Sequence, residues 1–149
     1  MKLTLDDVFD GILGDSLEGM AFTICDRSED QDFDWEDESR LWSSIDLLSP
    51  GSGRLVLVTD PETAKSLARS VTGEQTTDEA TELAVLEELT NAIGGRWLAA
   101  LETTGAETQL GLPKSGRGSL RPGEGAMACV YEVDAGRLGV LLASLRGGS

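Results

Sequence analysis

A carboxylate and a carboxamide stand three residues apart in the segment LEELTNAIGG, residues 86–95, as Glu88 and Asn91. On an α-helix these two positions lie about 60° apart around the axis, so both side chains leave the helix in nearly the same direction. A carboxamide donates and accepts hydrogen bonds but cannot act as a general base at physiological pH. It can hold a water molecule in line for attack on a phosphoryl group, as a glutamine does in GTPases. The spacing therefore predicts that both side chains point outward, and the residue types are compatible with positioning a water molecule.

The rest of the sequence contains few groups that could take part in catalysis with this pair. The sequence has no histidine, and its two cysteines, Cys25 and Cys129, have no CxxC spacing. This composition excludes a Ser-His or Cys-His nucleophile and argues against a zinc site, so we expect no metal site and no bound cofactor in this chain. There is also no P-loop and no glycine-rich dinucleotide fingerprint. A phosphoryl group and its metal ion would have to arrive on a partner.

The charge of the chain limits which partner this can be. Lys and Arg number 12 against 27 Asp and Glu, a formal net charge of −15. No basic stripe is present to neutralise phosphates or anionic lipids, so the sequence argues against nucleic acid and against a membrane surface. No apolar run is long enough for a membrane span, and Asp6, Asp7 and Asp10 interrupt the N-terminus where a signal peptide would be apolar. We expect a cytoplasmic protein that can dock a basic patch.

The hydrophobic periodicity predicts the order of elements along a single domain, residues 1–149. A helix is expected over about 5–18, a strand at AFTICDRS, and a solvated hairpin loop at the acidic segment, residues 29–39, with Phe33 and Trp35 against the body. Two strands around PGSG and a helix beginning at Pro61 and ending at Gly73 follow. A long helix over about 77–102, with Thr76 and Glu79 as a capping box, precedes the C-terminal strands. This order favours an α+β fold: two layers, with helices on one face of a largely antiparallel sheet.

The long helix should bury one face and present the reactive pair on the other. Residues that fall in its apolar sector are Leu83, Leu86, Thr90, Ile93, Trp97 and Leu101. Glu88 and Asn91 lie nearly opposite, among the small residues Ala84, Ala92, Gly95 and Ala99. A surface of small residues lets another protein approach closely. Alanine is also the best helix former, however, so exposed alanines do not require a binding partner to explain them. Gly94 is explained if a neighbouring helix passes close to it.

The segment LEELTNAIGG also resembles the signature helix of the CheC/CheX family of chemotaxis phosphatases. The similarity extends to GRLVLVTDPETAKSLARSVTG before the helix and to the final strands, ACVYEVDAG and GRLGVLLASL, over roughly residues 40–146. Pro113 of a GLP strand end lies 22 residues beyond Asn91, close to where the family places its proline. One position departs from the pattern: Ala84 stands where the family often has Asp or Ser, four residues before the motif acid.

The resemblance implies a function and a partner. Members of the family dephosphorylate CheY-type response regulators. By this likeness Asn91 would orient the attacking water, Glu88 would pair with a lysine of the partner, and the aspartyl-phosphate and Mg²⁺ would belong to the partner's receiver domain. The first helix lacks Glu-x-x-Asn, so the chain is more similar to CheX, with one site, than to CheC, with two. The resemblance also implies a homodimer formed through the sheets.

Two other interpretations stay open at this stage. The chain could be a non-catalytic module of the same fold that binds a response regulator or another signalling partner without hydrolysis, which Ala84 and the acidic segment favour. It could also be a dimeric structural domain whose polar helix face is solvated and idle. Mutation of Glu88 and Asn91 separates the three interpretations through binding and phosphate release.

Overall fold

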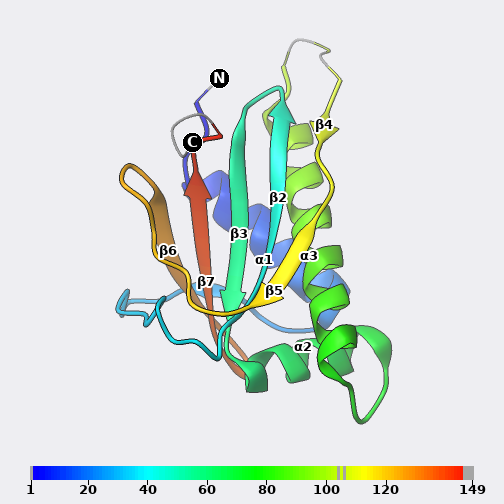
Figure 1. The fold of residues 1–149 in the computed structure, drawn as a ribbon. Helices are drawn as coiled ribbons and strands as arrows, with labels where there is room; N and C mark the ends of the chain where they lie inside the picture. The colour runs from blue at the N-terminus through cyan, green and yellow to red at the C-terminus, as the bar shows by residue number, and fades with distance from the viewer. Residues whose placement is uncertain (1, 104, 106, 146–149) are drawn as a thin grey trace.

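The computed structural model describes residues 2–103, 105 and 107–145. Within these residues the chain forms an α+β structure in which a mostly antiparallel sheet carries its helices on one face, as the sequence predicts (Figure 1). The elements, in chain order, are α1 (Asp7–Ala21), β1 (Asp26–Arg27), β2 (Leu41–Ser49), β3 (Gly53–Thr59), α2 (Pro61–Thr72), α3 (Glu79–Leu101), β4 (Gln109–Leu110), β5 (Lys114–Arg117), β6 (Met127–Val133) and β7 (Gly136–Ala143). None of these helices is long and apolar enough to cross a membrane.

The strands pair antiparallel throughout, in the order β1-β6-β7-β3-β2-β4, with β5 on the same edge of β2 as β4. Two short strands therefore share one long partner: β4 pairs with the end of β2 near Leu47, and β5 pairs with its beginning. Between them the N–H of Gly111 donates to the carbonyl of Asp46 at 2.8 Å. Because Leu112 follows this contact without a strand partner, its side chain is 86% exposed.

The main core lies between the sheet and helices α1 and α3, which run behind the sheet in Figure 1. Alternating side chains of the long strands point into it, as expected for a sheet with one face packed against helices. The rings of Phe9 on α1 and Trp97 on α3 meet edge to face, with centroids 4.7 Å apart. Tyr131 of β6 is buried beside Phe9. This aromatic cluster fixes α3 against the rest of the molecule, so that the opposite face of α3 is held outward.

Aspartates cap the starts of α1 and α3, at positions that differ from the predicted helix starts. The side chain of Asp6 accepts from the N–H groups of Val8 and Phe9, so α1 begins at Asp7 and not at about residue 5. Asp78 accepts from the N–H of Thr81 at 2.8 Å, so the expected capping box of Thr76 and Glu79 is wrong. Aspartate satisfies the free amide groups of a helix start as well as threonine does, and its charge also suits the helix dipole.

The prediction of a helix between Pro61 and Gly73 is confirmed. The helix α2 begins with Pro61 after the N-cap Asp60, and it ends at Gly73, whose positive φ of 77° lets its N–H reach the carbonyl of Arg69. The strand expected at AFTICDRS is shorter than predicted, because only Asp26 and Arg27 pair with β6. Phe22 there ends α1 in a left-handed conformation and is 76% exposed.

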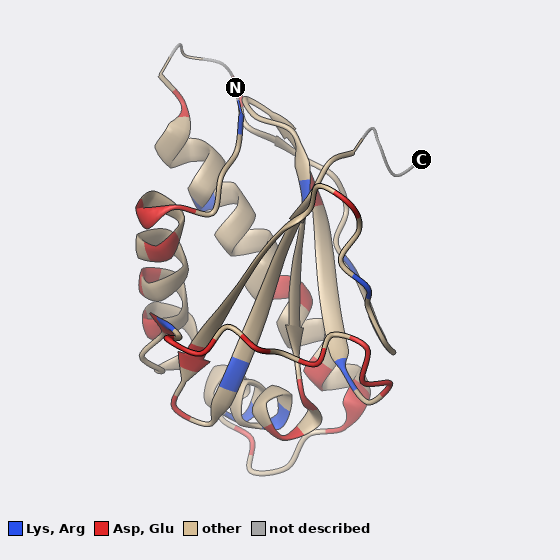
Figure 2. Ribbon diagram, turned by 90° about the vertical axis from the view of Figure 1, so that its left-hand side faces the viewer, with Lys and Arg blue, Asp and Glu red and all other residues tan. Residues whose placement is uncertain are grey.

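The acidic segment, residues 29–39, crosses the face of the sheet opposite the helices. It forms a loop, as predicted, but not a hairpin loop, because the flanking strands β1 and β2 do not pair with each other. Phe33 and Trp35 pack against the body, as predicted, on Val56, Val58 and Leu141. Hydrogen bonds tie the segment to the body: Arg40 donates to the carbonyl of Asp34 at 2.8 Å, and the side-chain amide of Gln31 donates to the carbonyl of Val130 and accepts from its N–H. Figure 2 shows acidic residues concentrated along this segment and along α1. The apolar side chains thus point inward while the carboxylates face solvent.

Candidate functional site

The helix α3 carries the predicted pair and places it on the surface. Leu86, Thr90, Ile93 and Trp97 are fully buried, while Leu83 and Leu101, at the edges of the predicted stripe, are only partly buried. The buried face is wider than the stripe, because α3 packs on the sheet and also contacts α1 and α2. It therefore includes Val85, Leu89, Gly94 and Leu98 as well.

Glu88 and Asn91 are both exposed on the opposite face of α3. Neither side chain makes a hydrogen bond or an ion pair with another residue in the described part of the chain. Asn91 is also the only asparagine in the sequence. The prediction that this pair leaves the helix toward solvent is confirmed. An unpaired carboxylate beside an unpaired carboxamide offers an acceptor for a cation and a group that can both donate and accept.

The other acidic side chains of α3 have partners within the chain. Glu79 accepts from Arg117 of β5, with its Oε1 2.7 Å from Nε. Glu82 is buried and accepts from the hydroxyl of Thr77 at 2.9 Å. Glu87, the neighbour of Glu88, accepts from the hydroxyl of Ser115 in β5. These contacts hold β5 and the start of α3 together, and they leave Glu88 as the carboxylate within α3 that is available to a partner.

The small residues around the pair divide into two kinds. Ala84 and Ala99 are exposed, whereas Ala92 and Gly95 are partly buried. A Cβ placed on Gly95 would lie 3.5 Å from Leu110 Cδ1 of β4, which is an ordinary contact. Gly95 therefore borders the sheet edge as well as the outer face.

Gly94 is explained by the sheet. A Cβ added there would lie 3.0 Å from Leu47 Cδ2 and 3.3 Å from Ile45 Cγ2, both on β2. The expectation that a neighbouring helix passes close to Gly94 is wrong, because the close neighbour is a strand. The glycine lets α3 approach β2 closely, and this approach supports the position of the whole helix.

A hollow that sequence reasoning missed adjoins Glu88. Its volume is about 450 Å³, and it lies between the end of α2 and the first turns of α3. The residues that line it are Thr72, Asp78, Ala80, Thr81, Ala84, Val85 and Glu88. The spacing of Thr81, Ala84 and Glu88 marks one helix face, but the wall from α2 could not be inferred from the periodicity of α3 alone.

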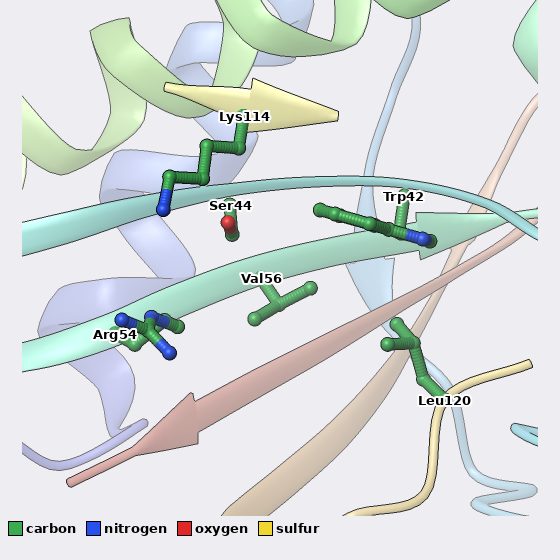
Figure 3. Close-up of a pocket in the computed structure, with 6 residues that line it drawn as sticks. All are labelled: Trp42, Ser44, Arg54, Val56, Lys114 and Leu120. Atoms are coloured by element: carbon green, nitrogen blue, oxygen red, sulfur yellow. The ribbon is translucent and has the colours of Figure 1, made fainter. Parts of the chain in front are cut away.

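A second hollow lies on the opposite side of the molecule, on the outer face of the sheet (Figure 3). Its volume is about 240 Å³, and its lining residues are Trp42, Ser44, Arg54, Val56, Lys114 and Leu120. Figure 3 shows the two cationic side chains at one end and Trp42 with Leu120 at the other. Arg54 is already paired with Asp46 at 2.8 Å. The residues that line this hollow include no carboxylate and carboxamide pair.

Comparison with known proteins identifies the fold. No protein-family model and no curated protein sequence matches the chain. Among solved structures, CheX from Desulfovibrio desulfuricans has a TM-score of 0.73 at 16% identity, over 92% of this chain and 96% of that one. CheX in a CheX–CheY–BeF3–Mg²⁺ complex from Borrelia burgdorferi has a TM-score of 0.73 at 17% identity, over 95% and 98%. FliY from Thermotoga maritima has a TM-score of 0.63 at 14% identity, over 96% and 92%.

The chain is thus a two-layer α+β protein with an exposed Glu-x-x-Asn pair on its longest helix. Its fold is that of the CheC/CheX chemotaxis proteins, which confirms the resemblance seen in LEELTNAIGG as a likeness of fold. A fold shared with FliY does not by itself define an activity. The functional argument therefore depends on the pair and its surroundings.

Proposed function

We propose that this protein is a phosphatase that acts on the aspartyl-phosphate of a CheY-type response regulator. The observation that carries the proposal is the exposure of Glu88 and Asn91, side by side and without partners in the described chain, on a helix of the CheX fold. A CheX–CheY complex among the structural neighbours supports the class of partner. Mg²⁺ belongs to the receiver domain in this proposal, and the phosphatase binds no cofactor of its own.

Asn91 orients the attacking water in the proposed reaction. A water oxygen attacks the phosphorus, the bond between phosphorus and the aspartyl oxygen breaks, and the aspartate leaves as a carboxylate with release of inorganic phosphate. The carboxamide of Asn91 holds this water by hydrogen bonds and takes no proton from it. Its contribution is geometric, because a reactant held in line for attack lowers the barrier without any change in acid-base chemistry.

Glu88 fixes the partner. Its carboxylate pairs with a lysine of the receiver domain, and this contact places Asn91 over the phosphoryl group. The small residues Ala84, Ala92, Gly95 and Ala99 form the remaining partner-binding surface. Homodimerisation through the sheets belongs to the same proposal, because it would leave the outer face of α3 free for the partner. We also propose a cytoplasmic location.

The direct test is phosphate release from a phosphorylated CheY-type receiver domain. Wild-type protein, Asn91→Ala and Glu88→Ala are compared with Gln109→Ala, which removes an exposed amide from β4. We expect release to be accelerated by wild type and by Gln109→Ala, and to fall by about 100-fold with Asn91→Ala. Full activity of Asn91→Ala would show that the mechanism is wrong.

A non-catalytic binding module is the second candidate, and one observation favours it. Ala84, one turn before Glu88, is exposed and offers neither the carboxylate nor the hydroxyl that the CheC/CheX motif often has there. If the protein binds the receiver domain without accelerating its dephosphorylation, this second function is correct. Binding and phosphate release are therefore measured on the same preparations.

A further inference from the structure

The hollow beside Glu88 has a chemical character that the phosphatase proposal does not use. Ala80, Ala84 and Val85 give it an apolar floor on α3, and Thr72 at the end of α2 forms part of its wall. Asp78 lies at one end and Glu88 at the other, ten positions further along the chain. At a rise of about 1.5 Å per residue, the two carboxylates are separated by about 15 Å along the helix axis.

The charges of the hollow have one sign. No lysine or arginine is among the residues that line it. Asp78 is exposed, and hydrogen bonds from the hydroxyl and the backbone N–H of Thr81 lower the pKa of its carboxyl group. Asp78 is thus ionised at neutral pH, and its exposed carboxylate has more lone pairs than these two hydrogen bonds use, so it can accept from a cation. An acidic end next to an apolar floor matches a long basic side chain, whose methylene groups are apolar and whose head is charged.

We propose that the hollow receives a second basic side chain of the partner, separate from the lysine that pairs with Glu88. The methylene stem of this Lys or Arg lies over Ala84 and Val85, and its cationic head lies at Asp78. This inference rests on the proposed function for the identity of the partner, a CheY-type receiver domain. The partner would then contact α3 at two places. Asn91 and Glu88 act on the phosphorylated site, and the hollow selects partners that carry a basic side chain near that site.

The small size of residue 84 is necessary for this contact. Ala84 is exposed on the floor of the hollow, between the two carboxylates. A larger side chain there occupies the space that the partner's methylene groups would fill. The change of Ala84 to phenylalanine therefore blocks the hollow while Glu88 and Asn91 remain in place.

The test measures binding of a CheY-type receiver domain activated with beryllofluoride and Mg²⁺. Asp78→Asn removes the charge and keeps a side-chain oxygen that can cap α3, and Asp60→Asn makes the same change at the N-cap of α2. Ala84→Phe is matched by Ala100→Phe, which adds a ring at an exposed position about 120° around α3 from Glu88. Circular dichroism and thermal unfolding establish that all four variants fold.

We expect Ala84→Phe to weaken binding by about 10-fold and Asp78→Asn to weaken it by about 3-fold, with a smaller salt dependence than wild type. Asp60→Asn and Ala100→Phe bind as wild type does and release phosphate at the wild-type rate. Wild-type affinity of both Ala84→Phe and Asp78→Asn would overturn the inference, as would equal losses in the matched controls. Loss of phosphate release with Asn91→Ala, measured in parallel, shows independently whether the phosphatase proposal stands.

Discussion

The outer face of α3 and the outer face of the sheet differ in whether their exposed side chains have partners within the same chain. On the sheet side, Phe33 and Trp35 of the acidic segment cover part of the apolar surface, and Arg54 is paired with Asp46. On the helix side, Glu88 and Asn91 face solvent without partners in the described chain. Side chains that satisfy one another stabilise a fold, whereas unsatisfied exposed ones are available to another molecule.

The difference also appears in the glycines of the two regions. Gly139 of β7 leaves room for an aromatic cover, since an added Cβ would lie 2.6 Å from Trp35 Cη2 and 2.9 Å from Phe33 Cε2. Gly95 on α3 has only one neighbour at an ordinary contact distance, Leu110. The chain's own segment therefore covers part of the sheet face, whereas the face of α3 around Glu88 and Asn91 stays exposed.

The largest expected effect is on the rate of phosphate release, which should depend on the face of α3 and not on the sheet face. Asn91→Ala should lower the maximal rate of phosphate release by about 100-fold, because the water loses its positioning group. Lys114→Met, on the sheet face, should leave that rate unchanged. Single-turnover phosphate release at saturating receiver domain measures both. Equal losses in the two variants would remove the functional distinction between the faces.

The next largest effect is a loss of stability caused by a substitution on the sheet face. Gly139→Ala forces the ring of Trp35 to move and should lower the free energy of unfolding by about 1–3 kcal/mol. Gly11→Ala on α1 is the matched control: nothing lies within 4 Å of its added Cβ, so this change should raise stability by up to about 1 kcal/mol. Urea denaturation measures both values. If Gly139→Ala is as stable as wild type, the acidic segment does not close this face as described.

A smaller effect distinguishes two adjacent glutamates. Glu88→Gln should weaken binding of the receiver domain by about 10-fold, because it removes the charge that meets the partner's lysine. Glu87→Gln should bind as wild type does, since Glu87 already accepts from Ser115 of its own chain. Titration calorimetry with the beryllofluoride-activated receiver domain gives both affinities. A greater loss for Glu87→Gln would mean that the wrong carboxylate faces the partner.

The smallest expected effect concerns how far the contact extends along α3. Ala99→Phe should weaken binding by about 2-fold, which is less than Ala84→Phe, because the hollow lies on the Ala84 side of the pair. Affinities of the two variants, measured under identical salt, decide the order. The reverse order would shift the docking surface toward Gly95 and Ala99 and away from the hollow.

Periodicity was sufficient to predict which way the reactive pair points. Because α3 is long and regular, the angular positions of Leu86, Ile93 and Trp97 settle which face is buried, and Glu88 and Asn91 follow by geometry. The antiparallel sheet also followed from the order of strands and turns.

Tertiary contacts account for what the sequence did not show. The cap at Asp78 competes with Thr76, which is equally suitable, and only the three-dimensional start of α3 decides between them. The strand neighbour of Gly94 and the wall that Thr72 adds to the hollow both come from segments distant in sequence. Neither can be derived from the pattern of a single helix.

The central claim is that the carboxamide of Asn91 enters the site of a phosphorylated partner. Because the chain has one asparagine, ¹⁵N-asparagine labelling gives a single pair of side-chain NH2 signals in an NMR spectrum. In a second sample labelled with ¹⁵N-tryptophan, the indole signals of Trp35 and Trp42 report on the sheet face. On addition of a CheY-type receiver domain activated with beryllofluoride and Mg²⁺, we predict that the Asn91 side-chain signals move while both indole signals stay in place. Unmoved Asn91 side-chain signals with shifted Trp35 and Trp42 signals would contradict the account.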